Sequence, residues 1–329
     1  MKQDSPNFSK GKFHNLSHTP QLTEGYTFGS VFKEMFFRKH PDKIPTRAIP
    51  TVKTNLLELA KEEEVLIWFG HSSYFIQVDG KRFLIDPVLS GNAAPIRGMI
   101  EAFRGTKIYT VEDLPEIDYL IITHDHYDHL DRKTIIRLKS KVKQVVCGLG
   151  VGAHLQKWGY DSTKIKENDW YSQLHLDNHF TLFTLPTRHF SGRGLKRNYT
   201  LWCSYLLQSP SMKIYLGGDS GYDTHFAEIG LCFENIDLAI LENGQYNKAW
   251  RYIHMFPEEV LQAVKDLKAK RLLPVHSSKF ALAHHPWNEP LSAITALNKQ
   301  TNIPLITPLI GEKVYLKEEN QCFKAWWEF

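Results

Sequence analysis

The chain has 329 residues, of which 42% are hydrophobic, and 40 Lys and Arg residues against 36 Asp and Glu residues give a formal net charge of +4. This length suffices for one large domain or two ordinary ones, and so small a positive excess indicates no nucleic acid partner. The four cysteines lie far apart, which argues against a disulfide framework and a thiolate zinc site. Without a signal-like apolar segment or a run of about 18 apolar residues, we expect a cytoplasmic protein with no transmembrane segment.

Residues 1–60 are polar and are interrupted by prolines at positions 20, 41, 45 and 50. We interpret them as an N-terminal extension packed on the core, with one main domain over residues 61–329. The amphipathic patch at 26–37 predicts a short helix. Its aromatic face is expected to pack on the domain, and a membrane-surface or dimer contact is the alternative; the face consists of Phe28, Phe32, Phe36 and Phe37.

Short apolar runs follow from residue 64 and predict β-strands. The pair Asp79-Gly80 is a two-residue hairpin signal. The clearest helix is expected over 257–270, with Pro257 at its first position and an apolar face of Val260, Leu261, Val264 and Leu267. Strands and helices alternate loosely, which indicates layered sheets and helices. The predicted strands are 65–70, 74–78, 82–86, 118–123, 143–148, 179–185, 199–207, 212–218, 237–242 and 271–276.

A dense group of metal-ligand side chains follows the predicted strand at 118–123, namely His124, His126, Asp128 and His129. Residues two apart can point the same way, so His124 and His126 can share one ion while Asp128 and His129 reach a second. Imidazole and carboxylate ligands suit zinc, iron or manganese. The alternative is a solvated polar turn rich in histidine, which the clustering of four donors in six positions disfavours.

Four ligands cannot saturate two ions, so further donors are expected at other strand ends. His189, Asp219 and His276 each lie just beyond an apolar run. Taken singly, each would be read as an ordinary loop residue. Together with the 124–129 cluster, they become candidate ligands.

The order HDHYDH, RHFSGRG, GGDSGY and PVHSS resembles the metallo-β-lactamase superfamily, over about residues 62–290. Within it, the likeness is greatest to the phospholipase D family that hydrolyses N-acylphosphatidylethanolamine, then to the ascorbate-6-phosphate lactonase branch. The resemblance implies an α+β fold, a four-layer αββα sandwich of two mixed sheets with helices outside. It also implies that His124, His126 and His189 hold one metal, that Asp128, His129 and His276 hold the other, and that Asp219 bridges them.

The implied activity is that of a dinuclear metal-dependent hydrolase with a metal-bridging hydroxide as nucleophile, oriented by Asp128. Two divalent ions are expected, with Zn²⁺ first and Mn²⁺ or Fe²⁺ as alternatives. The favoured reaction is phosphodiester hydrolysis of a small or lipid-derived molecule. The alternative is a lactonase or other ester hydrolase. Peripheral contact with a membrane through the 26–37 patch is left open.

Four further residues have two readings each. His71 is expected to contact a ligand or the substrate, or to be a structural histidine. Asp86 is expected to orient a ligating histidine rather than only to cap a turn. His254 matches the position of a substrate-side histidine in phospholipase D-like relatives, so it is the candidate for a catalytic or phosphate-binding group; otherwise it is a surface loop residue. Arg193 offers a guanidinium to a phosphate, on the weaker evidence of one arginine among glycines.

Overall fold

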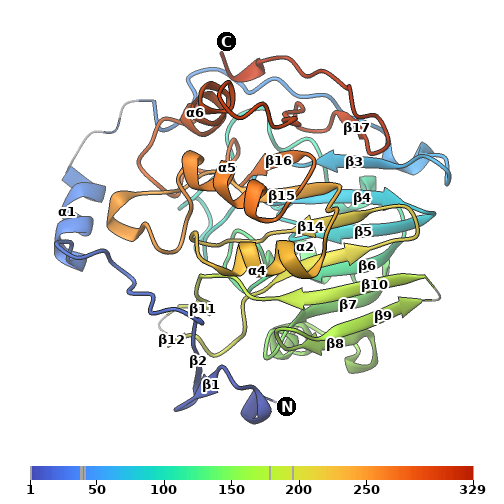
Figure 1. Cartoon of the computed structure of the whole chain (residues 1–329), viewed down its shortest axis with the longest axis horizontal. Helices are drawn as coiled ribbons and strands as arrows, with labels where there is room; N and C mark the ends of the chain where they lie inside the picture. The colour runs from blue at the N-terminus through green and yellow to red at the C-terminus, as the bar shows by residue number, and fades with distance from the viewer. Residues whose placement is uncertain (1, 38–39, 41, 178, 195, 329) are drawn as a thin grey trace.

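Two mixed β-sheets form the centre of the molecule (Figure 1). The computed structural model describes residues 2–37, 40, 42–177, 179–194 and 196–328, without the side chains of residues 35 and 36. The seven-stranded sheet has the order β17 (Lys313–Tyr315), β3 (Val65–Trp68), β4 (Tyr74–Val78), β5 (Lys81–Ile85), β6 (Ile117–Ile122), β7 (Val142–Gly148) and β8 (Ile165–Asn168). The six-stranded sheet has the order β16 (Leu272–Val275), β15 (Leu238–Glu242), β14 (Lys213–Leu216), β13 (Ser204–Gln208), β10 (Phe180–Leu185) and β9 (Gln173–Asp177).

The strands alternate their side chains between an inner and an outer layer, as a pleated backbone requires. In β3, Leu66 and Trp68 join the core between the sheets, whereas Val65 and Ile67 join a second core on the outer face. That outer core includes residues of α2 (Arg132–Leu138) and α3 (Gly152–Lys157). A third core lies between the six-stranded sheet and α4 (His225–Cys232), α5 (Pro257–Asp266) and α6 (Glu289–Asn298). This order of layers is the predicted αββα sandwich, which is confirmed.

All ten predicted strand runs contain a strand, with differences at their ends. Asp79 and Gly80 both have positive φ, 46° and 73°, as a two-residue hairpin requires. The strand predicted at 199–207 begins only at Ser204, because the amides of Leu201 and Cys203 donate to Leu149 and Thr123 of the other half of the sandwich. Helix α5 has Pro257 in its first turn but ends at Asp266, before Lys268 turns to a φ of 53°.

Strands β8, β9 and β17 were not predicted, because their sequences are polar and lie at or next to the sheet edges. Two small sheets complete the strands: β1 (Phe8–Ser9) with β2 (Lys12–Phe13), and β11 (Gly192–Arg193) with β12 (Lys196–Arg197). The 3₁₀ turns are Lys2–Asp4, Leu56–Glu58, Val111–Asp113, Ser162–Lys164, Lys248–Trp250 and Trp326–Glu328.

The first 60 residues contact the rest of the chain at several points. Phe13 is fully buried in the core between the sheets, and Ile49 belongs to the same core. The amides of Ile49 and Val52 donate to Arg104 and Ile310. The division of the chain into an extension and a main domain stays a prediction, since these contacts do not define a boundary.

Helix α1 (Phe28–Phe37) forms within the 26–37 patch, but its expected packing on the domain is wrong. Phe28, Phe32 and Phe37 are 65%, 58% and 78% exposed, and the side chain of residue 36 lies outside the described residues. The physical reason is the position of the helix, which lies apart from both sheets and beside the segment after β15 (Figure 1). None of the described helices has both the length and the hydropathy for a membrane crossing.

Candidate metal centre

The predicted ligands all follow the ends of strands, and the structure brings the seven of them together. His124 to His129 follow β6, and His189, Asp219 and His276 follow β10, β14 and β16. Because β6 belongs to one sheet and the other three strands belong to the second, the site lies where the two sheets meet at one edge. All seven are at most 9% exposed except His126, which is half-buried.

One donor group consists of His124, His126, His189 and Asp219, whose ligand atoms lie within 4.8 Å of one another. His126 Nδ1 is 2.9 Å from His124 Nε2 and 3.3 Å from His189 Nε2. Asp219 Oδ2 lies 3.7 Å and 3.6 Å from the same two Nε2 atoms. These are the three histidines that the resemblance assigns to one metal, together with the carboxylate assigned to the bridge.

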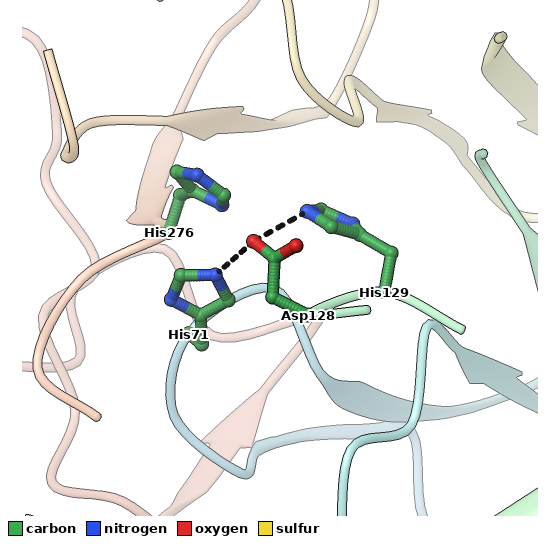
Figure 2. Close-up of side chains that lie close together, drawn as sticks. All are labelled: His71, Asp128, His129 and His276. Atoms are coloured by element: carbon green, nitrogen blue, oxygen red, sulfur yellow. Dashed lines mark hydrogen bonds and ion pairs between the residues drawn. The ribbon is translucent and has the colours of Figure 1, made fainter. Parts of the chain in front are cut away.

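The second donor group consists of His71, Asp128, His129 and His276 (Figure 2), again within 4.8 Å. Asp128 Oδ2 is 2.9 Å from His71 Nε2 and 3.5 Å from His129 Nε2. Asp219 joins this group to the first, with Oδ2 3.2 Å from His129 Nε2 and Oδ1 3.2 Å from His276 Nδ1. His71 is thus placed among the donors themselves, and its contact with Asp128 is of the kind that one of its two readings expected.

The donor set fits divalent cations. His126 Nε2, His129 Nε2 and Asp219 Oδ1 are buried atoms without a hydrogen-bond partner, and such orphaned polar atoms are costly unless something satisfies them. Imidazoles and carboxylates without a thiolate suit Zn²⁺, Mn²⁺ or Fe²⁺ equally. We infer that two cations are held here, one by each group, with Asp219 between them.

The non-ligating sides of the histidines are fixed by hydrogen bonds, which orient the rings. Asp86 follows β5 and lies 2.8 Å from His129 Nδ1, while it accepts from the amide of Thr123. Asp86 therefore has the contact that its predicted role requires. His189 Nδ1 is held by the carbonyl of Ile253 at 2.9 Å, and His276 Nδ1 by the hydroxyl of Ser72 at 2.9 Å.

The protonation of the site matches cation binding. Burial lowers the pKa of His124, His189 and His276 well below the ordinary value, so these imidazoles are neutral. Burial alone would raise the pKa of Asp219, but the neighbouring imidazoles hold it well below its usual range. Burial also opposes the charged form of His129, yet Asp219 and Asp128 raise its pKa well above normal. A cation would therefore displace one proton, from His129.

Backbone strain is stored at two of the loops. His71 and His276 have φ of 55° and 64°, a region that residues other than glycine seldom adopt. The two loops hold each other, because His71 N donates to Ser277 O and His276 N donates to His71 O, both at 3.0 Å. Such strain persists only where surrounding contacts over-determine it, and it is frequent at functional sites.

His254 lies beside the donors and is paired with a buried acid. Its Nδ1 is 2.6 Å from Oε2 of Glu242, the last residue of β15, and its ring centroid is 5.1 Å from that of His189. Burial raises the pKa of Glu242 to about 7. The pKa of His254 is also raised, because the attraction of Glu242 outweighs burial. Sequence analysis missed Glu242, although an acid closing the otherwise apolar run DLAILE was a usable signal.

Arg193 lies away from the space above the donors, contrary to its expected contact with substrate there. Its guanidinium donates to the carbonyls of Asp125 and Leu130 at 2.9 Å and 2.7 Å and lies 4.0 Å from the ring centroid of Tyr127. These contacts brace the 124–131 loop from outside. The one arginine that lines the cavity over the donors is instead Arg197, among the described residues.

The cavity over the donors has a volume of about 380 Å³. Its floor includes His126, Asp128, His189, Asp219 and His276, with His254 beside them. An apolar wall faces this floor and draws on the N-terminal segment and α1 as well as on the main domain; it consists of Leu22, Phe28, Val31, Phe190, Trp250, Ile253 and Leu282. The exposed position of Phe28 is therefore explained by its place at the mouth of the cavity.

Asn15 clamps one of the donors from the N-terminal segment, a contact that sequence analysis missed. Its Nδ2 donates to His189 O at 2.7 Å, and its Oδ1 accepts from His189 N at 3.1 Å and from Trp202 Nε1 at 3.0 Å. No local pattern marks Asn15, since its partner lies 174 residues away.

We expect Asn15→Ala to weaken metal affinity by about 10- to 100-fold, the usual cost of losing a residue that orients a ligand. Competition with a chromogenic chelator measures this affinity. Asn320→Ala, in the exposed C-terminal segment, is the matched control and should leave the affinity unchanged. Equal affinities of Asn15→Ala and the parent protein would show that the clamp does not position His189.

Comparison with known proteins defines the class. Residues 81–277 match the model of the beta-lactamase superfamily domain, and the chain belongs to this family. It is a metal-dependent hydrolase of that superfamily.

Two relatives and one solved structure show how the chain is placed within the family. The chain is 36% identical over 318 residues to an uncharacterized protein of Mycobacterium tuberculosis, covering 95% of this chain and 85% of that one. It is 29% identical over 286 residues to N-acyl-phosphatidylethanolamine-hydrolyzing phospholipase D 1 of Caenorhabditis elegans, covering 80% and 78%. The structure of Igni18, a metallo hydrolase from Ignicoccus hospitalis, superposes with a TM-score of 0.59 at 20% identity, covering 77% of this chain and 98% of that one. The last likeness shows the shared fold.

Proposed function

We propose that the protein is a phosphodiesterase of the phospholipase D type, acting on a lipid-derived phosphodiester with two divalent cations. The observation that carries this proposal is the shared cavity. Both donor groups meet at Asp219, and the same cavity is lined by His254 and by an apolar wall. The relative from Caenorhabditis elegans, which hydrolyses N-acyl-phosphatidylethanolamine, supports the choice of bond.

The floor of the cavity supplies groups for hydrolysis. When bound, divalent cations would lower the pKa of a water molecule and stabilise negative charge on a phosphoryl oxygen. Asp128, held by His71, would accept a hydrogen bond from the attacking water and orient it. The water oxygen forms the new bond to phosphorus, and the bond from phosphorus to the leaving alcohol breaks.

His254 is the group for the leaving alcohol, which needs a proton as its bond breaks. Glu242 occupies Nδ1 of His254, so Nε2 is the nitrogen that can deliver this proton. The buried carboxylate also stabilises the protonated imidazole, which is why the pKa of His254 is raised. Proton delivery by a positioned side chain accelerates such reactions by about 10²- to 10⁴-fold.

The apolar wall indicates the rest of the substrate. Phe28, Phe190, Trp250 and Ile253 offer aromatic and aliphatic surface directly above the donors. Burial of apolar surface contributes roughly 25 cal/mol per Å², so an acyl or alkyl group would add affinity here. Arg197, on the same cavity, is available to a phosphate oxygen that does not contact a cation.

The test compares bond types with one preparation of the metal-loaded protein. We expect turnover of bis(p-nitrophenyl) phosphate, and faster turnover of N-acylphosphatidylethanolamine in mixed micelles, with p-nitrophenyl acetate and a simple lactone cleaved at least about 10-fold more slowly, since preorganised charge stabilisation is specific to the bond. Asp219→Asn is the blank that removes background hydrolysis. Fast lactone or ester cleavage with inert phosphodiesters would overturn the proposal and assign the lactonase alternative.

A further inference from the structure

A second hollow, of about 560 Å³, lies next to the metal cavity and shares no lining residue with it. The two are separated by the 124–131 loop. His126 and Asp128 line the metal cavity, whereas Tyr127 and Asp131 line the second hollow. Its other walls come from α2, α3 and the segment after β5. A volume of roughly 300–1,000 Å³ is usual for a small-molecule site.

The hollow is strongly cationic. Five basic side chains line it, against the single carboxylate of Asp131; they are Arg97, Arg132, Lys133, Lys157 and Arg193. Asp131 does not neutralise them, because its oxygens accept from Ser90 N, Lys133 N and the hydroxyl of Thr134. Within the residues that the structure describes, no acid forms an ion pair with Arg97, Arg132, Lys133 or Lys157.

Unpaired like charges around one hollow repel each other and favour a bound anion. The four unpaired side chains are exposed, so a ligand can reach them from solvent. An adjoining hollow of about 540 Å³ shares Arg97 and Lys133 and adds Lys107, which extends the positive field. A phosphate monoester carries about −1.5 to −2 charges at neutral pH, so two of them balance four cations.

The aromatic rings of the hollow are already occupied, which bears on the class of ligand. Arg193 lies 4.0 Å from the ring centroid of Tyr127 and 5.3 Å from that of Trp158. His154 stacks on Trp158 at 5.9 Å. Single-stranded nucleic acid needs free aromatic faces on which bases stack, so the geometry favours a small phosphorylated molecule.

We propose that this hollow binds a small molecule with at least two phosphate groups, against the side of the metal-binding loop that carries Tyr127. Arg132 and Lys133 from α2, Lys157 from α3 and Arg97 from the segment after β5 converge on the phosphates. Guanidinium groups suit phosphate through paired hydrogen bonds. This site is independent of the proposed reaction, because none of these four residues lines the metal cavity.

Isothermal titration of the metal-loaded protein with fructose 1,6-bisphosphate tests the proposal. We expect binding with one molecule per chain, and weaker binding of inorganic phosphate. The double variant Arg132→Gln/Lys133→Gln should weaken bisphosphate binding by at least about 10-fold, because two charge-assisted contacts are lost. Lys265→Gln/Lys268→Gln removes the same charge from an exposed segment and should change the affinity less than about 2-fold.

The remaining outcomes separate the sources of phosphate and the rival explanations. If soluble inositol bisphosphate and vesicles that contain phosphatidylinositol bisphosphate both bind with the same sensitivity to Arg132→Gln/Lys133→Gln, the phosphate site stands and a lipid headgroup is a source. Absence of bisphosphate binding at low ionic strength overturns the proposal. Equal loss in the control variant, loss in Asp219→Asn, or tighter binding of a single-stranded RNA also overturns it.

Discussion

Asp219→Asn is expected to lower kcat/KM for a phosphodiester by about 10³-fold or more, since bound metal supplies several kcal/mol to the transition state and each 1.36 kcal/mol is a factor of ten. The reason is position, because Asp219 alone among the described donors has one oxygen near His129 and the other near His276 while also facing His124 and His189. The metal content should fall from two ions per chain to at most one. Elemental analysis of protein purified without added metal measures this directly.

Asp223→Asn is the control for this experiment, since it makes the same change four residues further on, where the carboxylate contacts Arg188 at 3.6 Å. It should retain both metals and full turnover. A thermal melt of each variant separates loss of metal from loss of the fold. Unchanged metal content and turnover in Asp219→Asn would contradict the two-metal centre.

His254→Ala is expected to lower kcat by about 10²- to 10⁴-fold while both metals stay bound, because a general acid is lost rather than a ligand. KM should change little if His254 acts on the leaving group, since that interaction forms only in the transition state. Steady-state kinetics and metal analysis on the same sample check both halves of the expectation. His175→Ala, at an exposed position in β9, is the matched control.

The alternative role of His254 has its own signature. His254, Asp219 and His276 also form a group whose ligand atoms lie within 4.8 Å, so a ligand role would appear as loss of metal in His254→Ala. Glu242→Gln distinguishes the cases further. It removes the charge that holds the imidazole and should lower kcat by less than His254→Ala does, with metal retained.

Much of the fold follows from local patterns in the sequence. The runs that became β4 and β5 alternate around a turn, Asp79-Gly80, whose residues accept positive φ. The start of β13 could not be predicted in this way. Residues 199–203 are as apolar as a strand, but they are hydrogen-bonded to Leu149 and Thr123 of the opposite half. Such a choice between partners depends on tertiary contacts and leaves no periodic signal.

The candidate site divides along the same line. The donors were found because His124, His126, Asp128 and His129 stand together and the others close apolar runs. The residues that orient them were mostly missed. Ser72 contacts His276 across 204 residues of chain, and Asn15 and Glu242 likewise act through distant partners. The exposed face of α1 was also unpredictable, because amphipathicity does not distinguish a buried face from the mouth of a cavity.

The dispersal of the donors along the chain has a consequence for how the enzyme acquires its cofactor in a cell. The ribosome must add 276 − 124 = 152 residues between the first and the last of them, which takes roughly 8 to 30 seconds at about 5–20 residues per second. Throughout that interval the nascent polypeptide offers only part of the coordination sphere. Selection among competing ions is therefore made after translation, by the completed sandwich.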